Sequence, residues 1–296
     1  TARLADFRVT QDHDRGRVAL DVVASAEPVA DASRARGARV SVRVALDGEI
    51  VANQTVPLEE SVGHAHLRIP KPQLWWPNTM GDQPLYDVTV DLESPDGTLL
   101  DEWKRRIGLR TLVLDRHRDE WGESFEFAVN DRPFFAKGAN WIPADAFANR
   151  VCPERYRDLL ESAALANMNM LRVWGGGFYE EEIFYDLCDE YGLCVWQDFM
   201  FACSAYPTFD PEFMDNVREE AVENVRRLRS HPCLALWCGN NELEQGLGGD
   251  SWSETTMSWD DYTPLFDELL RSVVEEHDGV AAYWPSSPHS PCGDRL

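Results

Sequence analysis

The stretch LALWCGNNE at 234–242 holds the residues with the clearest chemical potential. An apolar run too short for a helix ends in Gly239, two amides and the carboxylate of Glu242. Buried parallel strands have such continuous apolar sequences, and α/β barrels carry their chemistry at the carboxyl ends of the strands. Asn241 and Glu242 would then stand in an active site. The stretch alone fits equally well a helix N-terminus, where Asn caps the helix and Glu occupies its first turn without any catalytic role.

Other expected strands end in similar residues. They lead to Asn140-Trp141, to Trp174 with three glycines, to Gln197-Asp198, and to Trp284 followed by Pro-Ser-Ser. A single tryptophan of this kind is more often a core residue, but a series of such strand ends favours a shared pocket. Tryptophan beside amides and carboxylates suits a sugar, because flat apolar faces cover ring C–H groups and forked polar groups bind hydroxyls.

The elements that would position these residues lie in the second part of the chain. From about residue 125, strand-length apolar runs alternate with stretches of helical period. Helices are expected from Pro153 and over 180–191, 211–229 and 260–277. Strands are expected over 170–174, 193–198 and 280–284, besides the run at 234–238. This alternation predicts βα units and a parallel sheet.

The first part of the chain, residues 1–112, shows short alternating runs and no helical period. Val40, Val42 and Val44 share one face of a run that leads into the turn signal Asp47-Gly48. An antiparallel β-sandwich of roughly a hundred residues fits this pattern. The charged, apolar-poor stretch within 113–124 is expected to be a solvated linker, and 125–296 to form the second domain.

Composition excludes several partners. The formal net charge is −24, from 52 acidic and 28 basic residues, so nucleic acid and anionic membranes would be repelled. No apolar run of about 18 residues could span a membrane. The seven cysteines lack any CxxC spacing, which favours buried free thiols over disulfides or zinc, and a reducing, cytoplasmic location. No metal-ligand spacing is seen.

Taken in order, six motifs resemble the β-mannosidases of glycoside hydrolase family 2 over nearly the whole chain. They are LWWPN at 74–78, KGANWIPAD at 137–145, LRVWGGG at 171–177, WQDFMFAC at 196–203, WCGNNE at 237–242 and YWPSSP at 283–288. The resemblance implies an immunoglobulin-like β-sandwich followed by the N-terminal part of a (β/α)₈ TIM barrel. It also implies retaining release of terminal β-D-mannose from β-mannoside oligosaccharides or glycans, with no cofactor.

The same resemblance implies roles for the residues at 241 and 242. Glu242 would be the acid/base, which protonates the leaving oxygen and later activates water. Asn241 would hydrogen-bond the sugar 2-hydroxyl.

Further substrate-binding residues follow from the matched motifs. Arg172 would lie near the nucleophile and keep it ionised, or would instead form a structural ion pair. Trp174 would wall the sugar subsite, and Asp198 would bind hydroxyls or position the acid/base. Trp141 and Asp145 are the remaining candidates.

A retaining mechanism also needs a second carboxylate as nucleophile. No glutamate after residue 242 ends an apolar strand; these are Glu244, Glu254, Glu268, Glu275 and Glu276. The chain carries about five barrel strands, so it is expected to be an inactive, aggregation-prone internal fragment that lacks the nucleophile. Two alternatives stay open. One is an exo-β-glucosaminidase or other family 2 exo-glycosidase, and the other is a non-catalytic carbohydrate-binding protein.

Overall fold

The computed structural model describes residues 2–28, 37–248 and 257–290. Glu254 and Cys292, one of the seven cysteines, lie outside the described residues. The chain divides into two compact units. The first comprises Thr1–Trp76, Gly81–Thr111 and Ser230–Pro232, and the second comprises Pro77–Met80, Leu112–Arg229 and Cys233–Leu296.

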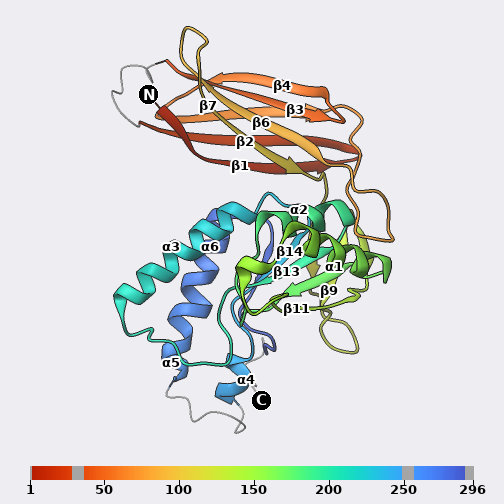
Figure 1. The fold of residues 1–296 in the computed structure, drawn as a ribbon, viewed down its shortest axis with the longest axis vertical. Helices are drawn as coiled ribbons and strands as arrows, with labels where there is room; N and C mark the ends of the chain where they lie inside the picture. Colours follow the sequence, from red (N-terminus) through yellow and green to blue (C-terminus); the bar gives the residue numbers. More distant parts are fainter. Residues whose placement is uncertain (1, 29–36, 249–256, 291–296) are drawn as a thin grey trace. The chain divides into compact units, whose positions relative to one another are not determined.

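The first unit contains two antiparallel sheets (Figure 1). One sheet has the order β1-β2-β5, and the other has the order β4-β3-β6-β7. Their bounds are β1 Ala2–Asp14, β2 Arg17–Pro28, β3 Arg39–Leu46, β4 Glu49–Pro57, β5 Val62–Ile69, β6 Tyr86–Glu93 and β7 Leu99–Ile107. This arrangement confirms the expected immunoglobulin-like sandwich.

Sequence alternation accounts for the sandwich core. Val40, Val42 and Val44 of β3 are at most 1% exposed and join one apolar cluster with residues from both sheets. The hairpin between β3 and β4 turns at Asp47 and Gly48, whose φ angles of 51° and 83° are both positive. A two-residue hairpin of this type needs positive φ at both positions, which Asp-Gly supplies.

The second unit contains a five-stranded parallel sheet in the sequential order β11-β12-β13-β14-β15. The strands are β11 Gly138–Trp141, β12 Met170–Val173, β13 Cys194–Asp198, β14 Leu234–Cys238 and β15 Ala282–Trp284. Sequential parallel order with intervening helices confirms the first part of a TIM barrel. The strand expected over 280–284 begins two residues later than predicted.

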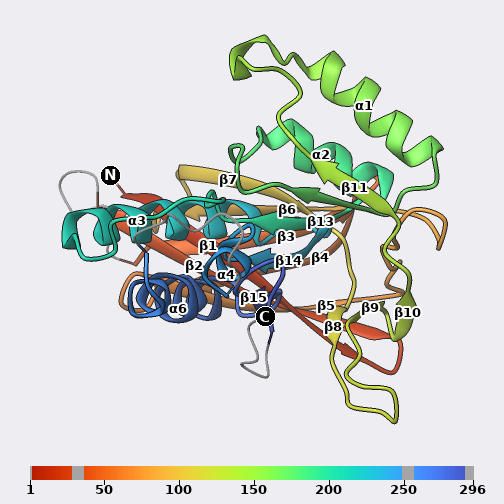
Figure 2. The ribbon, with the colours of Figure 1, turned by 90° about the horizontal axis from the view of Figure 1, so that it is seen from below.

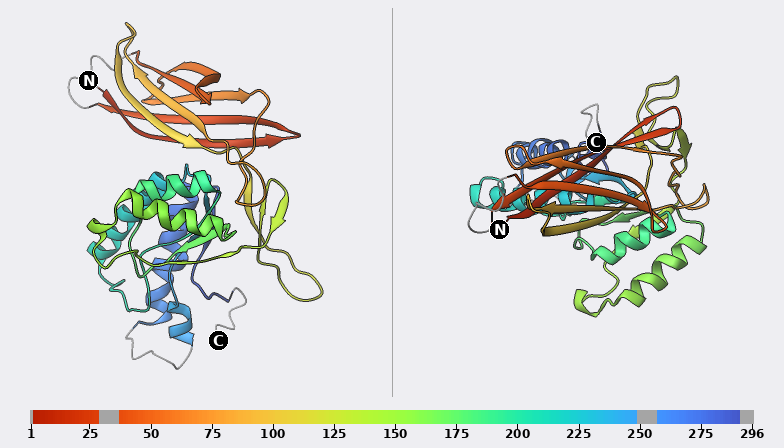
Figure 3. Two further views of the ribbon diagram at one scale, coloured as in Figure 1. Left: turned by 45° about the vertical axis from the view of Figure 1, so that its right-hand side comes forward. Right: turned by 90° about the horizontal axis from the view of Figure 1, so that it is seen from above.

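Helices connect these parallel strands. They are α1 Pro153–Leu165, α2 Glu182–Tyr191, α3 Pro211–Leu228, α4 Leu243–Gly248, α5 Trp259–Tyr262, the π-helix η3 Thr263–Leu269, and α6 Leu270–His277. Helices α1 and α2 lie side by side, as do α3 and α6 (Figures 2 and 3). The single helix expected over 260–277 includes the π-helical stretch because Pro264 lacks the N–H that a regular α-helix uses. None of these described helices combines the length and apolarity needed to cross a membrane.

The expected linker differs from the structure. Its first residues belong to β8, Leu112–Asp115, which pairs with β9, Glu126–Val129, and β9 pairs in turn with β10, Arg132–Phe134. Residues 116–125 therefore form the loop between two antiparallel strands. The strands on either side of this charged loop are short, so their apolar alternation was not recognised in the sequence. Leu112, Phe127 and Val129 in these strands are buried.

Candidate functional site

Strand register places the candidate residues on one face of the parallel sheet. Arg172 pairs with Asn140 on one side and Trp196 on the other, and Asp198 pairs with Cys238. Successive strand residues alternate between faces, so these five residues share one face, here called the inner face. The opposite face, the helix face, packs against the helices. Tyr185 of α2, for example, donates its hydroxyl to Gln197 at 2.7 Å.

An ion pair lies at the centre of the inner face. Arg172 donates to Asp198 twice, from Nε to Oδ1 at 3.1 Å and from Nη2 to Oδ2 at 2.7 Å. The fully buried Asp198 also accepts from the Gly175 N–H and the Trp196 indole N–H, each at 3.0 Å. Burial raises the pKa of the Asp198 carboxyl, and the three donors oppose that rise. The arrangement matches the structural ion pair that was one of the two predictions for Arg172.

Asn241 joins this ion pair to the loop after β13. Its Oδ1 accepts from Arg172 Nη2 at 3.0 Å, and its Nδ2 donates to Cys203 Sγ at 3.3 Å. Its backbone N–H donates to Phe201 O at 2.9 Å, and its carbonyl accepts from the Cys203 N–H at 3.1 Å. The backbone therefore extends the sheet beyond the strand ends and fixes Asn241, which is 6% exposed.

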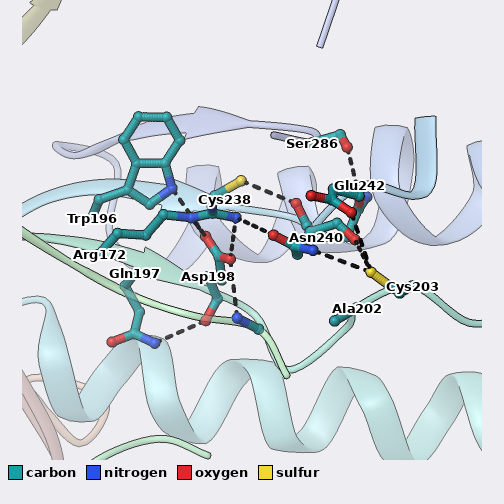
Figure 4. Close-up of polar contacts among 12 residues, drawn as sticks. Arg172, Trp196, Gln197, Asp198, Ala202, Cys203, Cys238, Asn240, Glu242 and Ser286 are labelled. Carbon is teal, nitrogen blue, oxygen red and sulfur yellow. Dashed lines mark hydrogen bonds and ion pairs between the residues drawn. The ribbon is translucent and has the colours of Figure 1, made fainter. Parts of the chain in front are cut away.

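Glu242 follows directly and is partly exposed. Its carboxylate Oε2 lies 3.5 Å from Cys203 Sγ (Figure 4). Its backbone N–H donates to Ser287 O at 3.1 Å. Its φ of 66° lies in the left-handed region. This backbone conformation costs free energy for any residue other than glycine. It is found mainly where the surrounding structure enforces it, often at functional sites.

Asn240 is a residue that the sequence reasoning missed. It is fully buried, and it donates to Pro285 O at 2.9 Å and Tyr262 Oη at 3.2 Å. It accepts from Ser286 Oγ at 2.7 Å and from the Leu243 N–H at 3.1 Å, at the start of α4. The strand ends at Cys238 and α4 begins at Leu243, so Glu242 precedes the helix, and Asn240 accepts the N–H of the first helical residue. A sequence signal for this contact was present, because Asn240 stands three residues before Leu243, the first residue of α4.

Trp174 lies at the end of β12. Its ring is partly exposed and lies against Gly176, where an added Cβ would come within 2.0 Å of the ring. Its backbone N–H donates to Trp141 O at 3.1 Å. Only glycine at position 176 leaves room for the indole in this position.

Trp141 and Asp145 are not brought into this cluster. Trp141 lies on the helix face, where its indole N–H donates to Glu180 Oε1 at 2.7 Å. Its ring stacks on that of Tyr156, with 6.3 Å between the ring centroids. Asp145 forms a surface ion pair with Arg150 at 2.5 Å, which lowers the pKa of its carboxyl. Asn140 and Trp141 are neighbours in a strand, so they could not both face inward.

The later glutamates do not end strands. Glu268, Glu275 and Glu276 are exposed on η3 and α6. Glu244, in α4, is 4% exposed, and its Oε1 accepts from Tyr262 Oη at 2.9 Å and lies 2.7 Å from His289 Nδ1.

Six described cysteines are free thiols. Four are buried as expected (Cys188, Cys194, Cys233 and Cys238), whereas Cys152 and Cys203 are exposed. The buried Cys233 lies beside Asp189, which accepts its backbone N–H at 3.0 Å. Burial raises the pKa of the Cys233 thiol well above its usual value.

Comparison with known proteins gives the following matches. Residues 2–110 match the family described as "Glycosyl hydrolases family 2", and residues 123–268 match "Glycosyl hydrolases family 2, TIM barrel domain". The chain is 40% identical over 302 residues to "Beta-mannosidase B" of Thermothelomyces thermophilus, which covers 97% of this chain and 34% of that protein. It is 47% identical over 223 residues to "Beta-mannosidase" of Capra hircus, which covers 73% of this chain and 25% of that protein. The chain thus spans about a third or less of the length of these curated relatives.

Solved structures of other proteins have the same fold as this chain. The crystal structure of a β-D-mannosidase from Dictyoglomus thermophilum superposes with a TM-score of 0.88 at 39% identity, over 99% of this chain and 36% of that one. An exo-chitosanase from Amycolatopsis orientalis superposes with a TM-score of 0.73 at 19% identity, over 96% of this chain and 32% of that one. At this lower identity the likeness extends to the fold alone.

Proposed function

Because the chain belongs to glycosyl hydrolases family 2, we propose that it supplies the acid/base half of a retaining exo-β-mannosidase site. The observation that carries this proposal is the position of Glu242. It is a partly exposed carboxylate beyond the carboxyl end of β14, in a left-handed backbone conformation, directly after the buried Asn241. In TIM barrels the ends of the strands at this side bear the catalytic groups.

Glu242 acts first as an acid and then as a base. As an acid it protonates the glycosidic oxygen while the bond to the sugar breaks. As a base it takes a proton from the water that releases the sugar from the enzyme. Its partial exposure fits this role, because both the leaving group and the water must reach it.

Asn241 binds the sugar 2-hydroxyl. Its amide already accepts from Arg172 and donates to Cys203. An amide has two lone pairs and two N–H groups, so one of each is left for a sugar hydroxyl. Arg172 and Cys203 hold the amide in one orientation, which avoids an ordering cost on binding.

Arg172 and Asp198 support the site rather than react. The Asp198 carboxylate is buried and carries four hydrogen bonds from three residues, so it is poorly placed to act as the nucleophile. Trp174, at the end of the neighbouring strand, supplies an aromatic wall for the sugar.

Turnover needs a second carboxylate about 5–5.5 Å from the first. The described strands of the parallel sheet end with one other carboxylate on the inner face, Asp198, and Arg172 occupies it. We therefore propose that this chain by itself does not hydrolyse β-mannosides and that the nucleophile comes from the remainder of a full-length protein.

Hydrolysis assays test these proposals. The purified chain should not release p-nitrophenol from p-nitrophenyl β-mannoside. The full-length protein should, and Glu242→Gln should abolish that activity. Release by the isolated chain that depends on Glu242 would contradict the missing nucleophile but support the acid/base.

Sugar preference needs a separate comparison. The full-length protein should hydrolyse the aryl β-mannoside with a higher kcat/KM than the matching aryl β-glucosaminide. The reverse preference would support the exo-β-glucosaminidase alternative. Binding of mannose without hydrolysis of either substrate would support the non-catalytic alternative.

A further inference from the structure

Side chains at and beyond the carboxyl ends of β12, β13 and β14 form a series of hydrogen bonds that runs from Arg172 to Glu242. We infer that Cys203 is a positioning residue, which donates its thiol proton to the Glu242 carboxylate and links it through Asn241 to the Arg172–Asp198 ion pair. The catalytic meaning of this link rests on the proposed function, whereas the link itself does not.

The chemistry of each group fixes the direction of the chain. An arginine side chain only donates, so the group of Asn241 that lies 3.0 Å from Arg172 Nη2 must be its oxygen. The amide nitrogen then points to Cys203, and the sulfur, at 3.3 Å, accepts from it. The S–H proton remains free to be donated, and Glu242 Oε2 lies 3.5 Å from the sulfur. A second acceptor, Asn241 O, is farther away at 3.9 Å.

The backbone holds the thiol in this place. The Cys203 N–H donates to Asn241 O at 3.1 Å, and the preceding Ala202 is bridged to Asn241 in the manner of a parallel strand. Cys203 has a φ of 48° and Glu242 a φ of 66°, both left-handed. Two contacting residues in conformations that cost of order 1 kcal/mol or more persist only where their surroundings impose them. The contact between thiol and carboxylate is therefore built into the loop ends.

The titration of the thiol agrees with its role as a donor. Partial desolvation of the sulfur raises the pKa of the Cys203 thiol, and the neighbouring Glu242 charge raises it further, while the hydrogen bond from Asn241 opposes the rise. The thiol thus keeps its proton near neutral pH, as a donor must. It gives the carboxylate one fixed partner while leaving Oε1 free for substrate or water.

Thiol alkylation in the 296-residue chain tests the link without any need for activity. The rate of reaction with iodoacetamide is measured against pH at Cys203 and at Cys152, with peptides separated and quantified by mass spectrometry. Cys152 is an exposed free thiol in the same sample and serves as the internal control. Glu242→Gln removes the charge but keeps the size of the side chain.

Glu242→Gln should raise the Cys203 alkylation rate near pH 8 by about fivefold, the effect of one unit charge at roughly 4 Å in water-like surroundings. It should leave the Cys152 rate unchanged. Asn241→Leu keeps the branched shape of the side chain but removes the donor to sulfur, so it should move the pH of half-maximal Cys203 alkylation upward, in the opposite sense. Unchanged Cys203 profiles in both variants, or equal changes at Cys152, would overturn the inference.

Kinetics of the full-length protein test the positioning role. Cys203→Ala should lower kcat/KM for p-nitrophenyl β-mannoside about tenfold and change the shape of its pH profile. Cys203→Ser, which keeps a donor, should restore most of both. Unchanged kinetics in Cys203→Ala would overturn the positioning role and leave Glu242 as acid/base intact. Full activity in Glu242→Gln would instead remove the proposed function, whatever the thiol does.

Discussion

Arg172 and Asp198 form a two-point ion pair between neighbouring parallel strands, with N–O distances of 3.1 and 2.7 Å. Their side chains are 18% and 0% exposed. Because Arg172 also donates to Asn241, this ion pair connects the interior of the sheet to the residue before Glu242. Its integrity therefore bears on stability and on the geometry of the site.

Removal of the Arg172 guanidinium should be strongly destabilising. Arg172→Ala leaves Asp198 as a buried charge without its cation, which costs about 3–5 kcal/mol. Arg150→Ala is the matched control, because its ion pair with Asp145 is exposed and worth about 0–1 kcal/mol. Urea unfolding of both variants checks this. Similar losses of unfolding free energy in the two variants would contradict the prediction that the buried Arg172–Asp198 pair matters more for stability than the exposed one.

The buried Asn240 should contribute strongly to the free energy of unfolding, because its side chain forms four hydrogen bonds. Asn240→Ala leaves the Ser286 hydroxyl and the Leu243 N–H without their acceptor, at about 1–3 kcal/mol for each unsatisfied group, so a loss of about 2 kcal/mol or more is expected. Ser286→Ala removes one of these bonds and should cost about 1 kcal/mol. Urea unfolding measures both. An Asn240→Ala loss no larger than that of Ser286→Ala would be inconsistent with the network.

Glu180 should give stability a distinct pH dependence. Burial raises its carboxyl pKa above the usual 4.5, although Tyr156 and Trp141 donate to it. A raised folded-state pKa means that its contribution to stability is fully present below the unfolded pKa and is lost as pH rises through the folded pKa. Glu180→Gln lacks this loss. Its free energy of unfolding minus that of the wild type should therefore increase with pH, by about 1.4 kcal/mol for each pH unit between the unfolded and the folded pKa.

Urea unfolding between about pH 4 and pH 8 measures that difference, across the range where carboxyl groups with raised pKa values titrate. Glu161→Gln, at an exposed position of α1, is the control for the change from a carboxyl to an amide. A difference for Glu180→Gln that falls with pH would contradict a raised pKa for the Glu180 carboxyl.

Gly138 should not tolerate any side chain. A Cβ added there would lie 1.6 Å from the carbonyl oxygen of Met170, which belongs to the paired strand β12. Backbone cannot move aside without breaking the strand pairing, so Gly138→Ala should cost more than about 4 kcal/mol. The neighbouring exposed Ala139 gives the control, since Ala139→Ser should change stability by less than about 0.5 kcal/mol. Thermal or urea unfolding distinguishes the two.

The sequence predicted the parallel sheet well because its strands and helices have different periods. Apolar runs such as 234–238 stood out between amphipathic helices, and the residues after them do meet at one edge. The sandwich followed from valine alternation and the Asp47-Gly48 turn for the same reason.

Side-chain direction was harder to predict. Trp141 was expected in the pocket, but alternation from Asn140 turns it to the helix face, where Glu180 binds its indole. Glu180 precedes α2 and lies 39 positions after Trp141 in the sequence, so no local sequence pattern could predict their hydrogen bond. Asp145 was likewise matched by motif and lies in a surface ion pair.

Long-range contacts between loops were invisible for the same reason. Cys203 and Glu242 lie 39 positions apart in the sequence, and their contact depends on two left-handed backbone positions. The stretch 113–124, expected to be a linker, contributes its first three residues to β8 and continues as the loop before β9, because its charges were a stronger signal in the sequence than the short flanking strands.

The acid/base role of Glu242 is tested most directly by the leaving-group dependence of Glu242→Ala in the full-length protein. With a mannobiose substrate, whose leaving group needs a proton, kcat/KM should fall by about 10²–10⁴. With 2,4-dinitrophenyl β-mannoside, whose leaving group departs unprotonated, kcat/KM should fall far less. An equal fall for the two substrates, or no fall for either, would contradict the assignment.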